Sequence, residues 1–410
     1  MALLRPFLAL RPRPALAARV AAVPYDVVTT EEARAQAADN PLSFLRVSRA
    51  EIELPPGTDP HDAAVYERAA ENFARLKQTA LVIEDEPSVY LYRLRTGSHE
   101  QTGVAACFSL DEYDHGLIKK HERTRKDKED DRTRHMLALG AQTGPVFLVH
   151  RAESAVSAMV ASVTAGNPLF DFEAADAVRH TLWSVAGDAR DGLVTAFAKI
   201  PALYIADGHH RAASAARASH DIRDRAITRT SLGDDADYTT FLGVAFPHDQ
   251  ARILPYNRIV KDLGTLSPAG FMDRVRERFE IAPGPATPVT RGEIAMYFEK
   301  KWSTLRPRVR PDDADPIRSL DVSVLEGELL EPILKIGDIR IDTRIDFVGG
   351  ARGTAELERL VDSGKAAVAF SLHPVRVADL IAVSDARDIM PPKSTWFEPK
   401  LRDGLLIHLI

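Results

Sequence analysis

The chain has 410 residues, enough for two or three ordinary domains or for one core with large insertions. Its apolar fraction of 45% and charged fraction of 27% are typical of folded proteins and exclude a largely disordered chain. The formal net charge of -6 gives no overall positive field for nucleic acid or an anionic membrane. Any site for an anion must therefore be local, and we expect neither of those partners.

The compartment is suggested by cysteine use and by the first 25 residues. Cys107 is the only cysteine, which excludes an intrachain disulfide and a multi-thiolate metal centre and fits a reducing environment. The first 25 residues contain arginines and no acids, as a targeting segment would, but Pro6, Pro12 and Pro14 interrupt any amphipathic helix there. We therefore expect a cytoplasmic protein.

The first elements carry clear start and stop signals. Residues 7–12 read as a short strand, and Thr29 or Thr30 is a suitable N-cap for a helix that ends before Pro41. Residues 59–81 have apolar side chains at helical spacing, so we expect a second helix there.

Strands and helices then alternate. Residues 88–95 and 102–113 are predicted strands around a turn at 96–98, whereas the densely charged 115–135 is predicted to be a loop. Further predicted strands are 145–150, 180–185, 202–206, 238–247 and 366–372, and further predicted helices are 188–200, 267–281, 353–364 and 373–387. This alternation predicts an α/β or α+β fold.

The stretch "ALYIADGHHRAASAARASH" joins a predicted strand to an alanine-rich helix. A helix start presents free N–H groups and the positive end of its dipole, and therefore attracts phosphate. Gly208 allows a tight turn, Arg211 supplies a fork for phosphate oxygens, and His209 and His210 donate or transfer protons. Asp207 would then bind Mg²⁺ or take a proton. The alternative is an Asp-Gly turn, a capping aspartate and solvated histidines.

These residues also carry a resemblance. "DGHHRAASA" resembles the corner with which members of the ParB/sulfiredoxin-like superfamily hold nucleotide phosphates. The whole chain resembles a widespread bacterial family of unknown function, through "RPFLALRP", "PYDVV", "NPLSFLRV", "KKHERT", "YIADGHHRAASA", "LPYNR" and "MPPKSTWFEPKLRDGL". The resemblance implies a discontinuous superfamily core over residues 1–280, with an inserted basic loop at about 115–135, and a mixed α/β elaboration over 281–410 that packs on it.

Free-serine kinases of that superfamily bear the same Asp-Gly-His-His-Arg corner and transfer phosphate between an adenine nucleotide and serine. The resemblance implies that Asp207 is the acid/base or Mg²⁺-holding carboxylate and that the next four residues hold phosphate. This chain is far longer than those kinases, and their other carboxylate has no motif match here, so Asp26 in "PYDVV" is only a candidate. Sulfiredoxin chemistry is disfavoured because His209 stands where a cysteine is needed, and ParB-like partition is disfavoured by the acidic balance.

A second constellation is "KKHERT". Lys119, Lys120, His121 and Arg123 can neutralise phosphate charges from a loop that closes over a nucleotide or a phosphorylated substrate. The alternative is a solvated charged loop, because the acids between 122 and 131 partly cancel its field. The family resemblance favours the phosphate interpretation.

Other segments supply further candidates. Arg46 suits a carboxylate or phosphate, although an ordinary surface position explains it equally well. The remaining candidates are Tyr256, Asn257 and Arg258 for substrate and Lys393, Ser394 and Thr395 for phosphate or nucleotide. No Walker-type or "GxGxxG" glycine pattern occurs, so standard P-loop and dinucleotide sites are disfavoured.

Together these features predict a phosphotransferase that acts on free serine or phosphoserine with ATP or ADP and Mg²⁺. Two alternatives stay open: a phosphoserine phosphatase in which His209 or His210 is the acid/base or phosphate acceptor, and a nucleotide sensor that turns nothing over.

Overall fold

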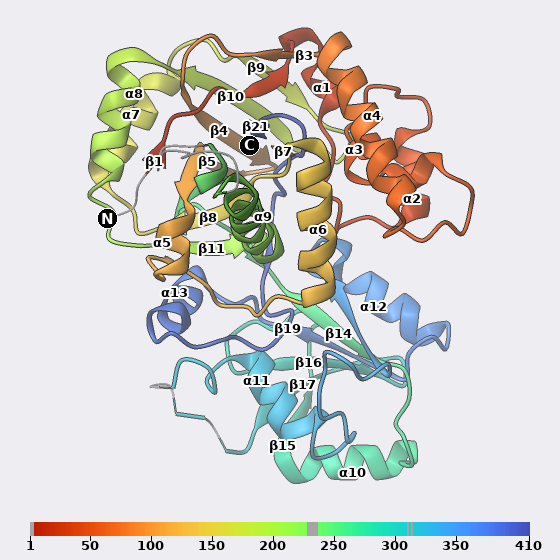
Figure 1. Ribbon diagram of the computed structural model, residues 1–410. Helices are drawn as coiled ribbons and strands as arrows, with labels where there is room; N and C mark the ends of the chain where they lie inside the picture. The colour runs from red at the N-terminus through yellow and green to blue at the C-terminus, as the bar shows by residue number, and fades with distance from the viewer. Residues whose placement is uncertain (1–3, 228–236, 310, 313–314) are drawn as a thin grey trace. The chain divides into compact units, whose positions relative to one another are not determined.

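The computed structural model describes residues 4–227, 237–309, 311–312 and 315–410 (Figure 1). The chain forms two compact units, the first made of Met1–Ala251 with Pro399–Ile410 and the second of Arg252–Glu398. This division differs from the boundary near residue 280 that the family resemblance implied. The mixed α/β class is confirmed, because each unit builds helices around a β-sheet.

The first unit is organised by a mixed sheet with nine strands in the described part of the chain. β11 pairs in parallel with β6 and antiparallel with β8, which places β6 and β11 at one end of the sheet. In spatial order the strands are β6 (Ile118–Lys119), β11 (Leu203–Asp207), β8 (Val146–His150), β12 (Thr240–Pro247), β5 (His99–Ser109), β4 (Val89–Thr96), β10 (Arg179–Val185) and β9 (Phe170–Glu173), and β1 (Leu4–Arg5) pairs with β5.

Helices pack around this sheet in the first unit. They are α1 (Ala17–Val20), α2 (Thr30–Ala37), α3 (Leu45–Ser48), α4 (Ala63–Thr79), α5 (Leu110–Asp114), α6 (Lys126–Leu139), α7 (Ser154–Thr164), α8 (Gly187–Phe197) and α9 (His209–Ile227), with 3-10 turns η1 (Pro14–Leu16), η2 (Ala50–Glu53) and η3 (Asp237–Thr239). Two short strand pairs complete the unit: β2 (Leu10–Pro12) with β3 (Leu81–Ile83), and β7 (Ala141–Gln142) with β21 (His408–Leu409).

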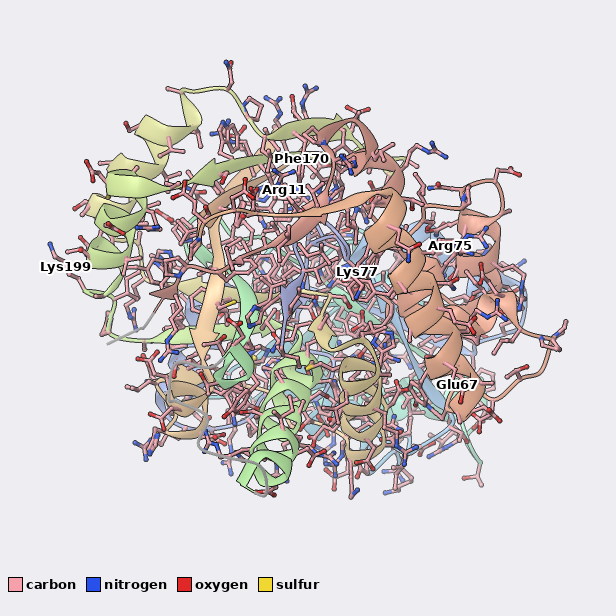
Figure 2. The ribbon with its side chains drawn as sticks, turned by 45° about the horizontal axis from the view of Figure 1, so that its top comes forward. Arg11, Glu67, Arg75, Lys77, Phe170 and Lys199 are labelled. Carbon is pink, nitrogen blue, oxygen red and sulfur yellow. The ribbon has the colours of Figure 1, made fainter. Side chains whose placement is uncertain are left out.

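The predicted helix signals are confirmed in α2 and α4. Thr29 caps α2 and exchanges hydrogen bonds with Glu32 in a capping box. In α4 the buried stripe includes Phe73, while Glu67 and Lys77 are exposed on the same helix (Figure 2). This apolar stripe belongs to a hydrophobic cluster separate from the one under the large sheet.

The alanine-rich sequence of helix α9 allows close packing. Ala212, Ala215 and Ala218 are buried in the main hydrophobic cluster, and the helix contacts β8, β12 and α6. Small side chains let the helix approach its neighbours closely, so its first turn is held firmly at the end of β11.

The expectation of a loop over the whole of residues 115–135 is wrong, because this segment contains β6 and most of α6. The acidic side chains of α6 are compensated by α9, where Arg217 forms ion pairs with Glu129 and Asp130. Buried Thr133 and Met136 supply the packing face.

The second unit contains a fully antiparallel sheet with six strands in the described part of the chain. In spatial order they are β15 (Phe279–Pro283), β17 (Lys301–Pro307), β16 (Ile294–Phe298), β19 (Val368–Leu372), β14 (Tyr256–Val260) and β18 (Ile345–Gly349), and β13 (Ile253–Leu254) pairs separately with β20 (Trp396–Phe397). Its helices are α10 (Pro268–Arg278), α11 (Asp321–Leu325), the π-helical turn η4 (Glu326–Leu330), the 3-10 turn η5 (Gly350–Arg352), α12 (Gly353–Asp362) and α13 (Val377–Asp385).

Within the described residues, no helix has both the length and the apolar character needed to cross a membrane.

Candidate functional site

The strand-to-helix corner forms as the sequence predicts. β11 ends at Asp207, Gly208 takes a left-handed φ of +95°, and α9 begins at His209. The amide of Ala212 donates to the carbonyl of Gly208 at 3.0 Å, so the backbone hydrogen bonding of the helix starts from Gly208. A side chain at 208 would be strained, and its Cβ would lie 3.0 Å from Nε of Arg211.

The three polar side chains after Gly208 have different partners, because successive helix residues point about 100° apart. His209 faces the segment after β6, its Nε2 lying 3.5 Å from the amide of His121. His210 accepts a hydrogen bond at Nε2 from the amide of Arg125 at 3.0 Å. Arg211 instead donates to the carbonyl of Pro145.

Parallel pairing of β6 with β11 explains why "KKHERT" lies beside this corner. Leu203 pairs with Ile118 and Tyr204 with Lys119, so the segments after both strands emerge at the same edge of the sheet. The rings of His121 and His209 meet edge to face at 4.5 Å. The structure thus brings together two segments that the sequence analysis singled out independently.

The cations of this segment are placed differently from one another. The ammonium of Lys120 lies 3.5 Å from the ring centroid of Tyr113, and that of Lys119 lies 5.7 Å from the ring of Tyr204. Arg123 is exposed. Two of the three cations therefore rest on aromatic rings beside the corner.

The carboxylate of Asp207 is held between two cations. Lys400 donates to its Oδ2 at 3.0 Å, and Nη2 of Arg211 lies 3.7 Å from its Oδ1. Burial alone would raise the pKa of Asp207, but the charges of Lys400 and Arg211 outweigh burial and lower it. Asp207 is consequently ionised at neutral pH and is a weak proton acceptor.

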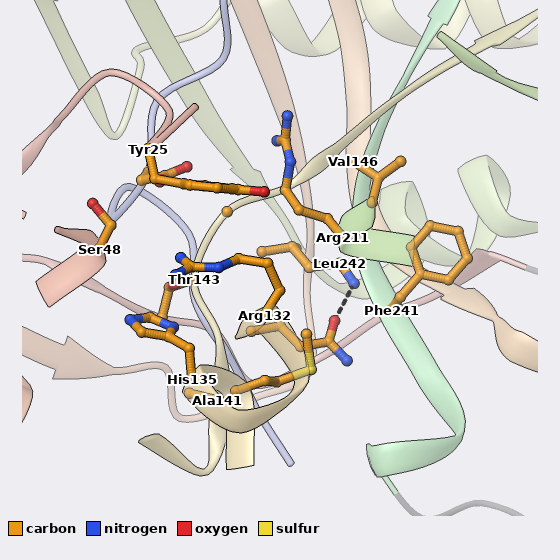
Figure 3. A pocket seen from close by; sticks show the side chains of 14 residues that line it. Tyr25, Ser48, Arg132, His135, Ala141, Thr143, Val146, Arg211, Phe241 and Leu242 are labelled. Carbon is orange, nitrogen blue, oxygen red and sulfur yellow. Dashed lines mark hydrogen bonds between the residues drawn. The ribbon is translucent and has the colours of Figure 1, made fainter. Parts of the chain in front are cut away.

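Arg211 also lines a small cavity of about 40 Å³. The side chains of Tyr25, Arg132 and Arg211 project into it (Figure 3). The guanidinium carbon of Arg132 lies 4.2 Å from the ring centroid of Tyr25. The other lining residues are Ser48, His135, Met136, Ala141, Gln142, Thr143, Gly144, Val146, Phe241, Leu242 and Asp403.

Asp403 is the acid of this cavity. Burial raises its pKa to about 7, with a further contribution from the charge of Asp26, while Arg211 and Arg132 oppose the rise. Its carboxylate lies against the backbone of Gly144, where an added Cβ would be 2.6 Å from Oδ1. Asp403 therefore exchanges a proton near neutral pH inside a cavity that also contains two guanidinium groups.

The pKa of Arg211 depends on the carboxylates around it. Burial lowers the pKa of Arg211, but Asp207, Asp26 and Asp403 raise it above its ordinary value. Its Nε is buried and has no hydrogen-bond partner among the described residues. The exposed Asp26 thus belongs electrostatically to this site.

Arg46 is not one of the described residues that line the cavity. It donates to Glu53 and, at 2.6 Å, to the carbonyl of Ala37, and so ties α3 to its neighbours. These hydrogen bonds give Arg46 a structural role.

The remaining candidates lie in the second unit. Asn257 is buried in β14 and accepts from the amide of Leu372 at 3.2 Å. Arg258 donates to the carbonyls of Tyr256 and, at 3.1 Å, Lys393. The ring of Tyr256 stacks on that of Trp396, with 5.1 Å between the centroids, and the Lys393 ammonium lies 5.7 Å from the Tyr256 ring. The hydroxyl of Ser394 donates to the Pro391 carbonyl at 2.5 Å, and Thr395 comes directly before β20. "LPYNR" and "PPKST" are therefore neighbours in that unit.

Sequence reasoning missed Lys400 and Asp403 as site residues, although both lie in "PKLRDGL", which was quoted for the family resemblance. Tyr25 was missed although it precedes Asp26 in "PYDVV", and Arg132 was missed because it belongs to no motif that the sequence analysis used. Glu122 was passed over as an acid that weakens the basic loop. Among the described residues, it belongs with His121 and His209 to the group whose ligand atoms lie close enough to share a metal ion, and Asp207 does not.

The family model described as "Protein of unknown function (DUF1015)" matches residues 4–323 of the chain. The protein belongs to this family. No curated protein matches this member of the DUF1015 family. Membership is thus the firm result of these comparisons, and the family description names no activity.

Solved structures show weaker similarity to this DUF1015 protein. A free serine kinase in complex with AMP matches with a TM-score of 0.36 and 14% identity, over 74% of this chain and 92% of that one. C-terminally truncated SbnI from Staphylococcus aureus has a TM-score of 0.39 and 11% identity, over 74% and 87%. A conserved hypothetical protein from Pyrococcus furiosus has 0.36 and 12%, over 75% and 95%. These values are too low to support an argument about activity.

Proposed function

We propose that this protein is a phosphotransferase whose site is the α9 corner and the adjoining cavity of the first unit. One observation carries the proposal: Arg211, in the first turn of α9, lines a cavity together with Arg132 and with Asp403, whose pKa is raised to about 7. Helix amides and guanidinium groups bind phosphate, and a nearby acid handles the proton of a reacting hydroxyl. Phosphoryl transfer needs these parts and no covalent nucleophile.

In this proposal the guanidinium of Arg211, at the N-terminal end of α9, binds phosphate. Arg132 faces the same cavity. Lys119, at the end of β6, and Lys120 and Arg123, which follow it, add positive charge from the segment beside β11. These groups offset the charge of a transferring phosphoryl group, which is the main catalytic requirement of this chemistry.

Asp403 is our choice for the proton acceptor. The attacking hydroxyl forms a bond to phosphorus, the bond from phosphorus to the nucleotide oxygen breaks, and the hydroxyl proton passes to Asp403. A pKa of about 7 suits this role better than the lowered pKa of Asp207. Asp207 then acts by fixing Lys400 and Arg211, and His210 holds the segment after β6 through the amide of Arg125.

The substrate and co-substrate are proposed from the motif resemblance. "DGHHR" is the corner that free-serine kinases bear, so we propose serine or phosphoserine as substrate, ATP or ADP as co-substrate and Mg²⁺ as the phosphate-bound ion. The relation to the ParB/sulfiredoxin-like superfamily rests on the same motif and stays a prediction.

The test follows phosphoserine with and without ADP and Mg²⁺ by ³¹P NMR. We expect serine and ATP to form only when ADP is present. Phosphate release without nucleotide would instead identify a phosphatase, and nucleotide binding without turnover would identify a sensor. Either result overturns the transferase.

Two variants separate the proposed roles. D403N should lower turnover at least about 100-fold with the fold intact by circular dichroism, because general acid–base catalysis contributes about 10² to 10⁴. D39N, a change at an exposed carboxylate of the first unit, is the control and should keep wild-type turnover. Full activity of D403N would remove Asp403 from the mechanism.

A further inference from the structure

A cluster of two histidines and a glutamate lies at the junction of two segments distant in sequence. His121 and Glu122 follow β6, and His209 opens α9. One ligand atom from each of the three side chains lies within 4.8 Å of the other two. Pairing of β6 with β11 holds the two segments together, so the cluster is a product of the fold.

The arrangement is close and partly enclosed. Nδ1 of His209 lies 4.0 Å from Oε2 of Glu122, and the two imidazole rings meet edge to face at 4.5 Å. His121 is 1% exposed and His209 6%, whereas the Glu122 side chain is 33% exposed. The cluster therefore has two buried nitrogen donors and one oxygen donor that reaches solvent.

The histidines are prepared to act as ligands. A hydrogen bond to the backbone of Ile205 orients the ring of His121, as bonds to backbone carbonyls commonly do for metal-binding histidines.

We propose that His121, Glu122 and His209 together bind one divalent ion of the zinc class. Two imidazoles and one carboxylate are a protein ligand set of open zinc sites, in which a fourth position is left for water or another small ligand. Mg²⁺ prefers oxygen ligands in octahedral geometry, so it fits this set poorly.

Only a small adjustment is needed for coordination. Ligand bonds of about 2.1 Å place tetrahedral donor atoms about 3.4 Å apart, compared with at most 4.8 Å here. Glu122 can supply most of the movement because its side chain is partly exposed. Zn²⁺ bound to one carboxylate and two neutral rings leaves a net positive charge beside the first turn of α9, which would favour an anion there.

The experiment measures metal binding with neither substrate nor nucleotide present, so its outcome is independent of the proposed phosphoryl transfer. The full chain, untagged and stripped of metal with a chelator, is titrated with Zn²⁺ by calorimetry and with Co²⁺ by visible absorption. We expect one ion per chain, a Co²⁺ spectrum of low coordination number, and no displacement by excess Mg²⁺.

Variants assign the ion to the cluster. E122Q and H121N should each weaken Zn²⁺ binding at least about 10-fold. The control is H220N, which changes an exposed histidine on the same helix, 3.7 Å from Asp114, and should bind as the wild type does.

A thermal measurement covers the case in which a variant is destabilised. Zn²⁺ should raise the Tm of the wild type and of H220N, but not that of E122Q. The proposal is wrong if the stripped wild type binds no stoichiometric Zn²⁺, or if E122Q and H121N both bind Zn²⁺ with wild-type affinity.

Discussion

Arg211 in the first unit and Arg258 in the second are both buried, at 9% and 1% exposure, yet their surroundings differ in kind. Arg211 is near carboxylates and lines a cavity, whereas Arg258 donates to backbone carbonyls and lies 5.4 Å from the ring of Phe347. Burial lowers the pKa of both, but nearby carboxylates raise that of Arg211, while that of Arg258 falls to about 10.

The difference distinguishes two uses of a buried guanidinium. Arg258 has its charge spread over carbonyls that it holds in place, so its role is to fix the loop around residues 391–394. The charge of Arg211 is instead compensated by nearby carboxylates, and its side chain lines the small cavity. Two arginines that the sequence singled out as candidates therefore have different roles: Arg258 holds backbone carbonyls, and Arg211 belongs to the proposed phosphate site.

The strongest test of this contrast is R211K. Lysine keeps the charge but loses the planar fork, so phosphoryl transfer measured by ³¹P NMR should fall about 10² to 10³-fold. R217K is the control, since Arg217 lies on the same helix, is 39% exposed, and pairs with Asp130 outside the cavity. Unchanged turnover in R211K would indicate that Arg211 has only a structural role, as Arg258 does.

The converse test is R258M. Removing the guanidinium leaves the carbonyls of Tyr256, Pro392 and Lys393 without this donor, and the free energy of local unfolding should drop by about 3 kcal/mol. Hydrogen exchange of peptides from β14 and residues 391–394 measures the drop.

The matched control for R258M is R306M, at an exposed arginine of the same sheet that pairs with Glu293. It should cost about 1 kcal/mol or less. Equal protection in both variants would contradict the structural role of Arg258.

The pH dependence of stability sharpens the account of the acids around Arg211. Asp403 has a pKa of about 7 in the fold and 3.8 ordinarily, so folding favours its protonated form. That contribution is complete below pH 3.8 and disappears as the pH rises through 7. Between about pH 5 and pH 8, D403N should therefore gain about 2 to 3 kcal/mol of unfolding free energy relative to wild type.

Denaturant melts at several pH values measure this difference. The exposed variant D39N is the control and should show no comparable trend. Parallel stability curves for D403N and wild type would show that Asp403 titrates normally.

The smallest expected effect is that of G208A. Alanine at φ +95° is strained, and its Cβ would also press on Arg211, so we expect a loss of about 1 to 2 kcal/mol together with weaker phosphate binding. G57A shares the positive φ, at +88°, and has no atom within 4 Å of its Cβ. It should lose stability without affecting phosphate affinity. Equal phosphate binding in both variants would separate Gly208 from the site.

Local patterns predicted much of the fold. The capping box at Thr29 and Glu32, the hairpin turn at 96–98 and the β11–α9 corner all follow from residues within a few positions of each other. The first turns of α6 fall in the segment predicted to be a loop, because they carry charges rather than an apolar stripe. Those charges are compensated by Arg217, which lies far away in the sequence.

Part of the candidate site could likewise be predicted from local sequence, and part could not. Local sequence indicated residues 207–211 and 119–123 separately, but their contact depends on the pairing of β6 with β11. Lys400 and Asp403 could not be placed, since their partners Asp207 and Gly144 are reached only through the fold. Charge and spacing therefore indicated the proposed anion-binding segments, while the proposed proton acceptor could be found only from the tertiary structure.

The position of residues 399–410 has a consequence for biosynthesis. This segment supplies Lys400 and Asp403 to the first unit and pairs as β21 with β7, yet it follows the whole second unit in the chain. A nascent chain can build most of the large sheet early, because domains tend to fold as they leave the ribosome. During that time Asp207 lacks its lysine and the cavity lacks its acid. Synthesis of the second unit thus delays completion of the first, and a translation product truncated before residue 399 would carry an incomplete site.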